Sequence, residues 1–232
     1  MGLNWFMTRI NLRQKERHNI FMAKGIIISF EGTDGSGKTT QIKALSEYLA
    51  KKGYQSEMLR EPGGTKIGEE IRSIVLNKYN TEMASLTEML LYASSRAQMM
   101  EEKVEPLLKE GRIVILDRFF DSSLAYQAFG RDLDFDAVLS INLAAVKNIV
   151  PKITFFIDIT PEQSLKRRQN ATATDRLENE DMSFHYKVYE GYKKLLEKFP
   201  ERIIRIDGTK EAKEITNEIT SYVDNVLKED IR

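Results

Sequence analysis

The chain has 232 residues, of which 41% are hydrophobic and 30% are charged, so it can bury one sizeable core and a single domain is the favoured organisation. Its 35 basic residues balance its 35 acidic residues, which argues against nucleic acid or an anionic membrane as a partner. The sequence has no cysteine and no apolar stretch near the ~20 residues that span a bilayer, which excludes disulfides, thiolate metal sites, cysteine nucleophiles and a membrane-spanning helix.

Residues 1–21 differ from the rest of the chain, because they are basic, show no clear period and lack the apolar core of a secretory signal. One interpretation is an Arg-rich organellar targeting segment. The other is an upstream extension, with translation starting naturally at Met22. The abrupt onset of a strand pattern after Lys24 favours the second interpretation. We therefore predict an N-terminal extension over 1–21, disordered or not native, and a single domain over 22–232.

From Gly25 onward, short β-branched runs alternate with longer segments of helical period. This alternation predicts an α/β fold with a five-stranded parallel sheet flanked by helices. The predicted strands are 26–31, 54–59, 112–117, 153–158 and 202–207. The predicted helices are 38–52, 66–77, 82–109, 134–148, 161–170, 180–198 and 211–229, the fifth with Thr160 as N-cap and Pro161 in its first turn. In such sheets, ligands bind at the carboxyl ends of the strands.

The segment "GTDGSGKT" follows the first predicted strand, precedes a predicted helix and matches G-x-x-x-x-G-K-[ST] at every fixed position. Its glycines let backbone N–H groups point at phosphate oxygens, and the helix N-terminus adds the positive end of its dipole. Lys38 supplies a mobile charge for the outer phosphates, and Thr39 is placed to ligate Mg²⁺. A glycine-rich turn explains the glycines but neither the lysine nor the threonine. We therefore predict a nucleoside triphosphate site at Gly32, Thr33, Asp34, Gly35, Ser36, Gly37, Lys38, Thr39 and Thr40.

The next two predicted elements carry candidate acceptor residues. The segment "REPGGTKIGEEIR" places a rigid turn after the second strand, and its Glu61 and Arg72 either line a pocket or cap and solvate the following helix. In helix 82–109, Tyr92 and Arg96 lie one position off the predicted apolar stripe and share a neighbouring face. An aromatic ring and a guanidinium can stack on and hydrogen-bond a base. The simpler alternative is a boundary tyrosine and a solvated arginine. The predicted stripe itself is Leu86, Leu90, Ala93, Ala97, Met100, Val104 and Leu107.

The third predicted strand ends in the pair Asp117 and Arg118. A carboxylate at this edge can hold Mg²⁺ or its waters, and a guanidinium can grip a phosphoryl group through paired donors. The alternative is a structural ion pair. The following "SSLAYQ" offers hydrogen-bonding groups suited to a sugar and a base edge, although taken alone it would be a polar loop. These groups are Ser122, Ser123, Tyr126 and Gln127.

Together, "FEGTDGSGKTT", "REPGG", "LLYASSRAQ", "DRFFDSSLAYQ" and "DRLE" resemble the thymidylate kinases of the bacterial type, over roughly residues 25–229. The resemblance implies a three-layer P-loop kinase fold with a mobile lid, and transfer of the γ-phosphoryl group of ATP to dTMP, with Mg²⁺, to give dTDP in dTTP biosynthesis. It also implies a cytoplasmic homodimer whose small-molecule partners are ATP and dTMP. The alternatives are a kinase for another nucleotide or deoxynucleoside, and a non-catalytic P-loop switch.

The resemblance also implies roles for individual residues. Tyr92 would stack on thymine, where the family usually has phenylalanine, and Arg96 would hydrogen-bond a base oxygen. Ser123 and Gln127 would bind the base edge, with Tyr126 against the deoxyribose. Arg72 and Arg118 would hold the dTMP phosphate, and Glu61 would lie near the acceptor end. Asp34 would lie near the sugar or the metal. Thr39 and Asp117 would hold Mg²⁺.

One departure from the family concerns the catalytic arginine, which comes either from the P-loop position before Gly37 or from the lid. That position is Ser36 here, so the resemblance shifts the charge to the lid, predicted at about 168–178, "RQNATATDRLE". We predict that Arg168 is the catalytic arginine, with Arg176, assigned to the ATP site, as second candidate. For Arg168 the alternative is a solvated helix terminus. Lys38, Arg118 and Asp34 complete the predicted catalytic set.

Overall fold

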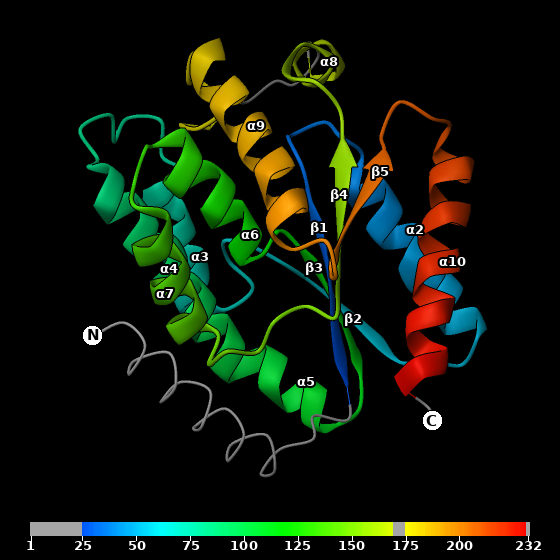
Figure 1. The fold of residues 1–232 in the computed structure, drawn as a ribbon. Coiled ribbons are helices and arrows are strands. Elements are labelled where there is room, and N and C mark those ends of the chain that lie inside the picture. The colour runs from blue at the N-terminus through cyan, green and yellow to red at the C-terminus, as the bar shows by residue number, and fades with distance from the viewer. Residues whose placement is uncertain (1–24, 169–174, 231–232) are drawn as a thin grey trace, which may run out of the picture.

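A computed structural model of the chain describes residues 25–168 and 175–230, with side chains to residue 228. Within these residues, five parallel strands form one sheet in the order β2-β3-β1-β4-β5 (Figure 1). Their bounds are β1 Ile26–Glu31, β2 Ser56–Arg60, β3 Ile113–Asp117, β4 Ile153–Asp158 and β5 Ile203–Asp207. The predicted fold class is confirmed, with β2 starting two residues later than expected. The predicted extension 1–21 and positions 169–174 of the predicted lid lie outside the described residues.

Helices cover both faces of the sheet and form two separate cores. On one face lie α2 (Lys38–Lys51) and α10 (Ala212–Asp230) (Figure 1). On the other lie α4 (Ser85–Met99), α6 (Phe120–Ser123), α7 (Phe135–Ala145) and α9 (Met182–Lys198). Because successive strand residues point to opposite faces, Ile113 and Ile115 of β3 enter the first core, while Val114 and Leu116 enter the second. No helix in the described residues is long and apolar enough to cross a membrane.

The predicted helix 82–109 consists of three consecutive helical segments. They are α4 (Ser85–Met99), the π-helical η1 (Met100–Val104) and α5 (Glu105–Lys109). The predicted apolar stripe is wrong in its first half, because Leu86 and Leu90 are exposed. The buried face of α4 is instead formed by Glu88, Met89, Tyr92, Ala93, Ser95, Arg96 and Met99. The helix therefore turns mixed polar and apolar side chains inward, against α3 (Lys66–Val75), α7 (Phe135–Ala145) and the residues after β3.

The segment after β3 is helical rather than a polar loop. It forms α6 (Phe120–Ser123) and the π-helical η2 (Leu124–Gly130), which pack on α4 and α9 (Met182–Lys198). Phe120, Leu124 and Ala128 are buried at a spacing of four, which is the helical signal in this part of the sequence. This correction matters for function, because a helix presents Ser123 and Gln127 on one side, one turn apart.

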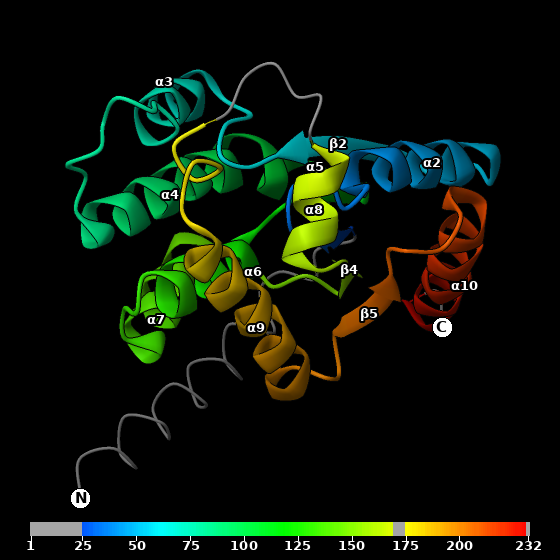
Figure 2. The same cartoon turned by 90° about the horizontal axis from the view of Figure 1, so that it is seen from above.

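At the carboxyl edge, α8 (Pro161–Arg167) follows β4 (Figure 2). Thr160 accepts a hydrogen bond from the Gln163 backbone N–H at 3.3 Å, and the Gln163 side chain accepts one from the Thr160 N–H at 2.9 Å. This reciprocal cap confirms the predicted start of the helix, with Pro161 in its first turn. The helix ends at Arg167, so Arg168 is its C-cap. Arg168 is thereby held next to the loop that follows β1.

Candidate active site

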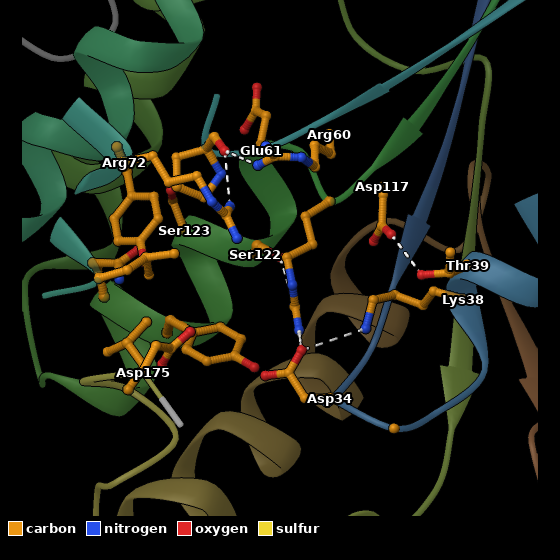
Figure 3. A pocket seen from close by; sticks show the side chains of 18 of the residues that line it. Asp34, Lys38, Thr39, Arg60, Glu61, Arg72, Asp117, Ser122, Ser123 and Asp175 are labelled. Carbon is orange, nitrogen blue, oxygen red and sulfur yellow. Dashed lines mark hydrogen bonds and ion pairs between the residues drawn. The ribbon is translucent and has the colours of Figure 1, made fainter. Parts of the chain in front are cut away.

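A cavity of about 380 Å³ opens at the carboxyl ends of β1, β2 and β3 (Figure 3). Residues from both halves of the predicted site line it: Asp34, Gly35, Gly37, Lys38, Thr39, Thr40, Glu61, Arg72, Tyr92, Asp117, Arg118, Ser123, Tyr126 and Gln127. Ser122 of "SSLAYQ" lines it too, and its walls also include residues that are absent from the predicted set: Arg60, Pro62, Leu76, Asp175 and Leu177. Arg60 and Pro62 belong to "REPGG", and Asp175 and Leu177 belong to "DRLE", so the sequence carried a signal for these four.

The loop between β1 and α2 has the backbone form of a phosphate cradle. Gly32 and Gly37 adopt φ angles of +133° and +99°. A Cβ atom at Gly32 would lie 2.6 Å from the carbonyl oxygen of Ile157, so only glycine fits there. Gly37 is the N-cap of α2, and no side chain of the described residues caps the N-terminus of this helix. The first amides of α2 are therefore available to an anion at the cavity.

Lys38 lies at the base of this loop, with 6% of its surface exposed. Its Nζ donates to the carbonyl oxygens of Gly32 at 3.0 Å and Thr33 at 2.9 Å. Burial, and then the positive charge of Arg118, lower the pKa of Lys38 to about 8. The ammonium group thus stays charged at neutral pH while it is held against backbone carbonyls beside the cavity.

Asp34 lies between two cations at the mouth of the loop. Its Oδ1 accepts from Nη2 of Arg118 at 2.7 Å and lies 4.0 Å from Nζ of Lys38, which it faces in Figure 3. Burial opposes ionisation of Asp34, but the charges of Arg118 and Lys38 outweigh it and hold the pKa of the carboxyl well below its usual range. Arg118 itself has a φ of +69° and stacks on the ring of Tyr126, 5.3 Å from the ring centroid. Asp34 therefore ties the phosphate loop to Arg118, the residue that follows β3.

Thr39 and Asp117 meet where the first turn of α2 approaches the end of β3. The Thr39 hydroxyl donates to Oδ2 of Asp117 at 3.1 Å, and both residues line the cavity (Figure 3). Mg²⁺ prefers oxygen ligands and commonly uses one or two protein groups plus phosphate and water. A hydroxyl and a carboxylate at the phosphate loop fit this ion. The described residues contain no cluster of three or more His, Cys, Asp or Glu side chains that could hold a metal.

Two arginines converge on the wall formed by the turn after β2. Nη1 of Arg72 donates to the carbonyl oxygen of Pro62 at 2.9 Å, and Nη1 of Arg60 donates to the same oxygen at 3.2 Å. Arg60 is further held by Glu69 at 3.0 Å. Burial, and then the charge of Arg60, lower the pKa of Arg72 below its ordinary value. This corner of the cavity therefore concentrates positive charge and suits an anionic group of a ligand.

Arg96 is not a solvated side chain, because only 1% of its surface is exposed. Its guanidinium donates to Glu61, Ser123, the Phe119 carbonyl oxygen and Asn142, with the Ser123 bond at 3.1 Å. Burial raises the pKa of Glu61, against the lowering effect of the Arg96 charge. Arg96 does not line the cavity, so the structure places it behind Glu61 and Ser123 rather than at the predicted base contact. Tyr92, one turn away on α4, does line the cavity.

The two lid arginines lie in different places. Nη1 of Arg168 is 3.9 Å from Oδ2 of Asp34 and 3.1 Å from Glu178. Arg176 instead donates to the Val75 carbonyl oxygen at 3.1 Å and to Oε2 of Glu88 at 2.5 Å. Arg168 thus lies beside the phosphate loop. Arg176 is buried on the acceptor side, which argues against its predicted contact with ATP.

Glu31, absent from the predicted set, is a fully buried carboxyl group at the end of β1. It accepts hydrogen bonds from the Phe119 N–H at 2.7 Å, the Ser122 hydroxyl at 2.6 Å and the Tyr192 hydroxyl at 2.9 Å. Burial, and then the negative charge of Asp121, raise the pKa of Glu31 to about 7. An acidic residue that ends a continuous apolar strand was the available signal. Glu31 braces the residues that follow Arg118.

Comparisons with known proteins show which family the chain is similar to. The family model for thymidylate kinase matches residues 30–219. A thymidylate kinase of Thermoanaerobacter sp. (strain X514) is 53% identical over 204 residues, which cover 88% of this chain and 100% of that protein. One of Bacillus velezensis is 46% identical, covering 88% and 97%. A crystal structure of thymidylate kinase from Ehrlichia chaffeensis superimposes with a TM-score of 0.69 at 31% identity, covering 86% of this chain and 98% of the other.

Proposed function

Because the chain belongs to the thymidylate kinase family, we propose that it transfers the γ-phosphoryl group of ATP to dTMP, giving dTDP and ADP. The observation that carries this proposal is that the phosphate loop and acceptor-side residues such as Arg72 and Gln127 line the same cavity. A phosphoryl transfer needs donor and acceptor aligned in one space from which water can be excluded. Two separate pockets would not serve this reaction.

On the donor side, the amides at the start of α2 and the ammonium group of Lys38 would bind the outer phosphates of ATP. Thr39 and Asp117 would hold Mg²⁺, which neutralises charge on phosphate oxygens when it is bound. Arg168 would add positive charge from the side of α8, since it lies next to Asp34 and the loop. The contact between Gly35 and Arg168 supports this placement, because a Cβ atom at Gly35 would lie 3.1 Å from Cγ of Arg168.

On the acceptor side, Arg72 would bind the dTMP phosphate, and Arg60 would contribute from the same corner of the cavity. Arg118 lies between the two halves and would hold the phosphoryl group in transit, because its guanidinium already pairs with an anion there. Tyr92 would stack on the thymine, with Ser123 and Gln127 at the base edge. Tyr126 would lie against the deoxyribose, beneath the guanidinium of Arg118.

An assay of ADP release with dTMP, dUMP, dCMP and dAMP as acceptors tests the function. We expect the highest kcat/KM with dTMP. Failure to release ADP above background with any acceptor would refute the kinase function and favour a P-loop switch. Preference for dAMP would refute the thymidylate assignment and leave a kinase for another nucleotide.

The family resemblance also supports a homodimer that acts in the cytoplasm. Light scattering coupled to gel filtration tests the first point, with twice the mass of the chain as the expected result. A mass equal to one chain at all accessible concentrations would contradict the dimer. Fluorescence microscopy of a tagged full-length chain in the source cells tests the location.

A further inference from the structure

A fully buried carboxylate, Glu88 of α4, lies behind the wall of the cavity. Its Oε1 accepts a hydrogen bond from Nε2 of Gln127 at 2.8 Å. Its Oε2 accepts from Arg131 at 3.0 Å and from Arg176 at 2.5 Å. Gln127 lines the cavity whereas Glu88 does not. Arg131 and Arg176 do not line the cavity either, so the Gln127 amide is the hydrogen-bond link from Glu88 to a bound ligand.

The charge state of Glu88 determines how that amide is oriented. Burial opposes ionisation, but hydrogen bonds from Arg131 and Gln127 and the charges of Arg131 and Arg176 lower the pKa of Glu88 below its ordinary value. An ionised carboxylate only accepts hydrogen bonds, so the amide atom that faces it must be the nitrogen of Gln127. A half-turn of the amide would bring two acceptor oxygens together in a buried site, at the cost of the hydrogen bond and with added repulsion.

We propose that Glu88 is a positioning residue that determines which pyrimidine the cavity accepts. By holding the nitrogen of Gln127, it presents the carbonyl oxygen of the same amide to the base as an acceptor that cannot exchange places with the nitrogen. This inference rests on the proposed function, because it concerns the base of the nucleotide acceptor. It assigns specificity to a side chain that does not touch the substrate.

The chemistry of the bases follows from this orientation. Thymine and uracil carry an N–H donor at N3 beside the O4 carbonyl, whereas cytosine has an unprotonated N3 beside an amino group. The carbonyl oxygen of Gln127 pairs with the N3–H donor but faces the lone pair of cytosine N3. Binding cytosine on the same edge would require the reversed amide, which Glu88 prevents. The cavity therefore excludes cytosine by a buried charge rather than by size.

Ser123, one turn before Gln127, is oriented by a charged residue of α4 in the same way. Its hydroxyl oxygen accepts from Nη1 of Arg96 at 3.1 Å, which leaves the hydroxyl hydrogen to donate to a base carbonyl. Arg96 and Glu88 lie two turns apart on α4, opposite Ser123 and Gln127. Two oppositely charged residues of one helix thus orient one donor and one acceptor on the facing segment. This pair matches the carbonyl and N–H of the thymine edge.

The test compares kcat/KM for dTMP, dUMP and dCMP between the wild-type chain and Glu88→Gln. A neutral amide at position 88 accepts either orientation of Gln127, so we expect the dTMP-to-dCMP ratio to fall by about tenfold or more, the size of one lost buried hydrogen bond. The dTMP-to-dUMP ratio should stay unchanged, since both bases carry N3–H. A merely structural role for Glu88 would lower all three values in parallel.

Glu180→Gln is the matched control, because Glu180 accepts from the same Arg131 at 2.5 Å and lies outside the cavity wall. It should keep both wild-type ratios. If Glu88→Gln fails to fold, Glu88→Asp replaces it in the test. The shorter side chain keeps the negative charge for both arginines but withdraws the carboxylate from Gln127. This variant too should lower the dTMP-to-dCMP ratio.

A folded Glu88 variant with the wild-type dTMP-to-dCMP ratio would overturn the inference while leaving the kinase function intact. A fall of similar size in the Glu180→Gln control would also overturn it, because the effect would then belong to the arginine cluster. A wild-type chain without activity on dTMP would instead refute the proposed function, before any variant is compared.

Discussion

At the scale of single residues, the centre of the cavity is a row of alternating charges. Asp34 lies 4.0 Å from the ammonium group of Lys38 and 2.7 Å from the guanidinium of Arg118. A phosphoryl group has the same sign of charge as Asp34, so we expect it to attract both cations as it binds. Catalysis would then rest on the alignment and neutralisation of charge, as a loose phosphoryl-transfer transition state requires.

Replacement of Lys38 tests the donor half of this row. Lys38→Ala should lower kcat by about 100-fold or more, because a buried group that stabilises transition-state charge typically contributes that much. Steady-state ADP release measures the loss, and thermal unfolding checks that the fold is retained. Lys43→Ala, an exposed lysine on the same helix, should keep wild-type kcat. A folded Lys38→Ala enzyme with near-native turnover would refute the role of the phosphate loop.

Replacement of Arg168 tests the origin of the second donor-side charge. Arg168→Ala should reduce kcat by about tenfold or more while the Kd for dTMP changes little, because Arg168 borders the phosphate loop and not the acceptor wall. Single-turnover kinetics and dTMP titration separate the two effects. Arg167→Ala is the control, since the Arg167 side chain donates to the Gly208 carbonyl oxygen at 2.8 Å. If kcat were unchanged, the catalytic arginine would have to be sought elsewhere.

At the scale of secondary structure elements, helix α4 organises the acceptor half of the cavity. Glu88, Tyr92 and Arg96 occupy successive turns of its buried face. Glu88 holds Gln127, Tyr92 faces the cavity, and Arg96 holds Glu61 and Ser123. The apolar stripe predicted from the sequence lay one position away from this buried face, because hydropathy alone does not identify charged side chains that are buried. Their partners come from the turn after β2, from α6 and from η2, which are distant along the chain.

Removal of the Arg96 charge tests how strongly this helix depends on its buried ion pair. Arg96→Met should lower the free energy of unfolding by about 3–5 kcal/mol, because it leaves the Glu61 carboxylate buried and without its partner. Urea denaturation at neutral pH measures the change. Lys187→Met, which removes an exposed pair with Asp132, should cost less than about 1 kcal/mol. Equal small losses in both variants would show that the Arg96 pair contributes nothing specific.

At the scale of the whole molecule, Glu31 joins β1, the residues after β3 and α9 through three hydrogen bonds. It lies next to the phosphate loop in sequence, and it faces the charges of Asp121 and Arg118 and the hydroxyl of Tyr192. The same carboxyl group therefore supports both the sheet edge and the segment of Arg118. Its raised pKa makes the packing of these parts dependent on pH.

The pH dependence follows from the sign of this shift. Between pH 4.5 and about 7, folded chains keep a proton on Glu31 that unfolded chains release. The stability that this proton contributes is fully present below pH 4.5 and is lost as pH rises to about 7. The difference in free energy of unfolding between wild type and Glu31→Gln should therefore fall by up to about 3 kcal/mol across this window. Taking the difference cancels other titrating groups such as His185, whose lowered pKa acts in the opposite direction.

Urea denaturation of both proteins at several pH values between 4.5 and 8 provides the measurement. Asp34 does not interfere, because its depressed pKa affects stability only at more acidic pH. A constant difference between the two proteins across the window would show that Glu31 is ionised throughout and would contradict the expected coupling.

The sequence alone determined the fold class, the phosphate loop and most of the cavity lining. These features depend on local rules: the alternation of strands and helices, the steric need for glycine at positions such as Gly32, and the placement of motifs at strand ends. Each can be recognised in a short segment because its physical cause lies within that segment.

Only the tertiary structure decided which charges are buried and what they hold. Arg176 resembled a donor-side residue in the sequence, yet it pairs with Glu88, 88 positions away, and Arg96 proved to be buried against four protein groups. Glu31 and Glu88 drew no attention in the sequence, since an isolated glutamate is most often solvated. A buried charge is stable only with partners, and here those partners come together through long-range packing.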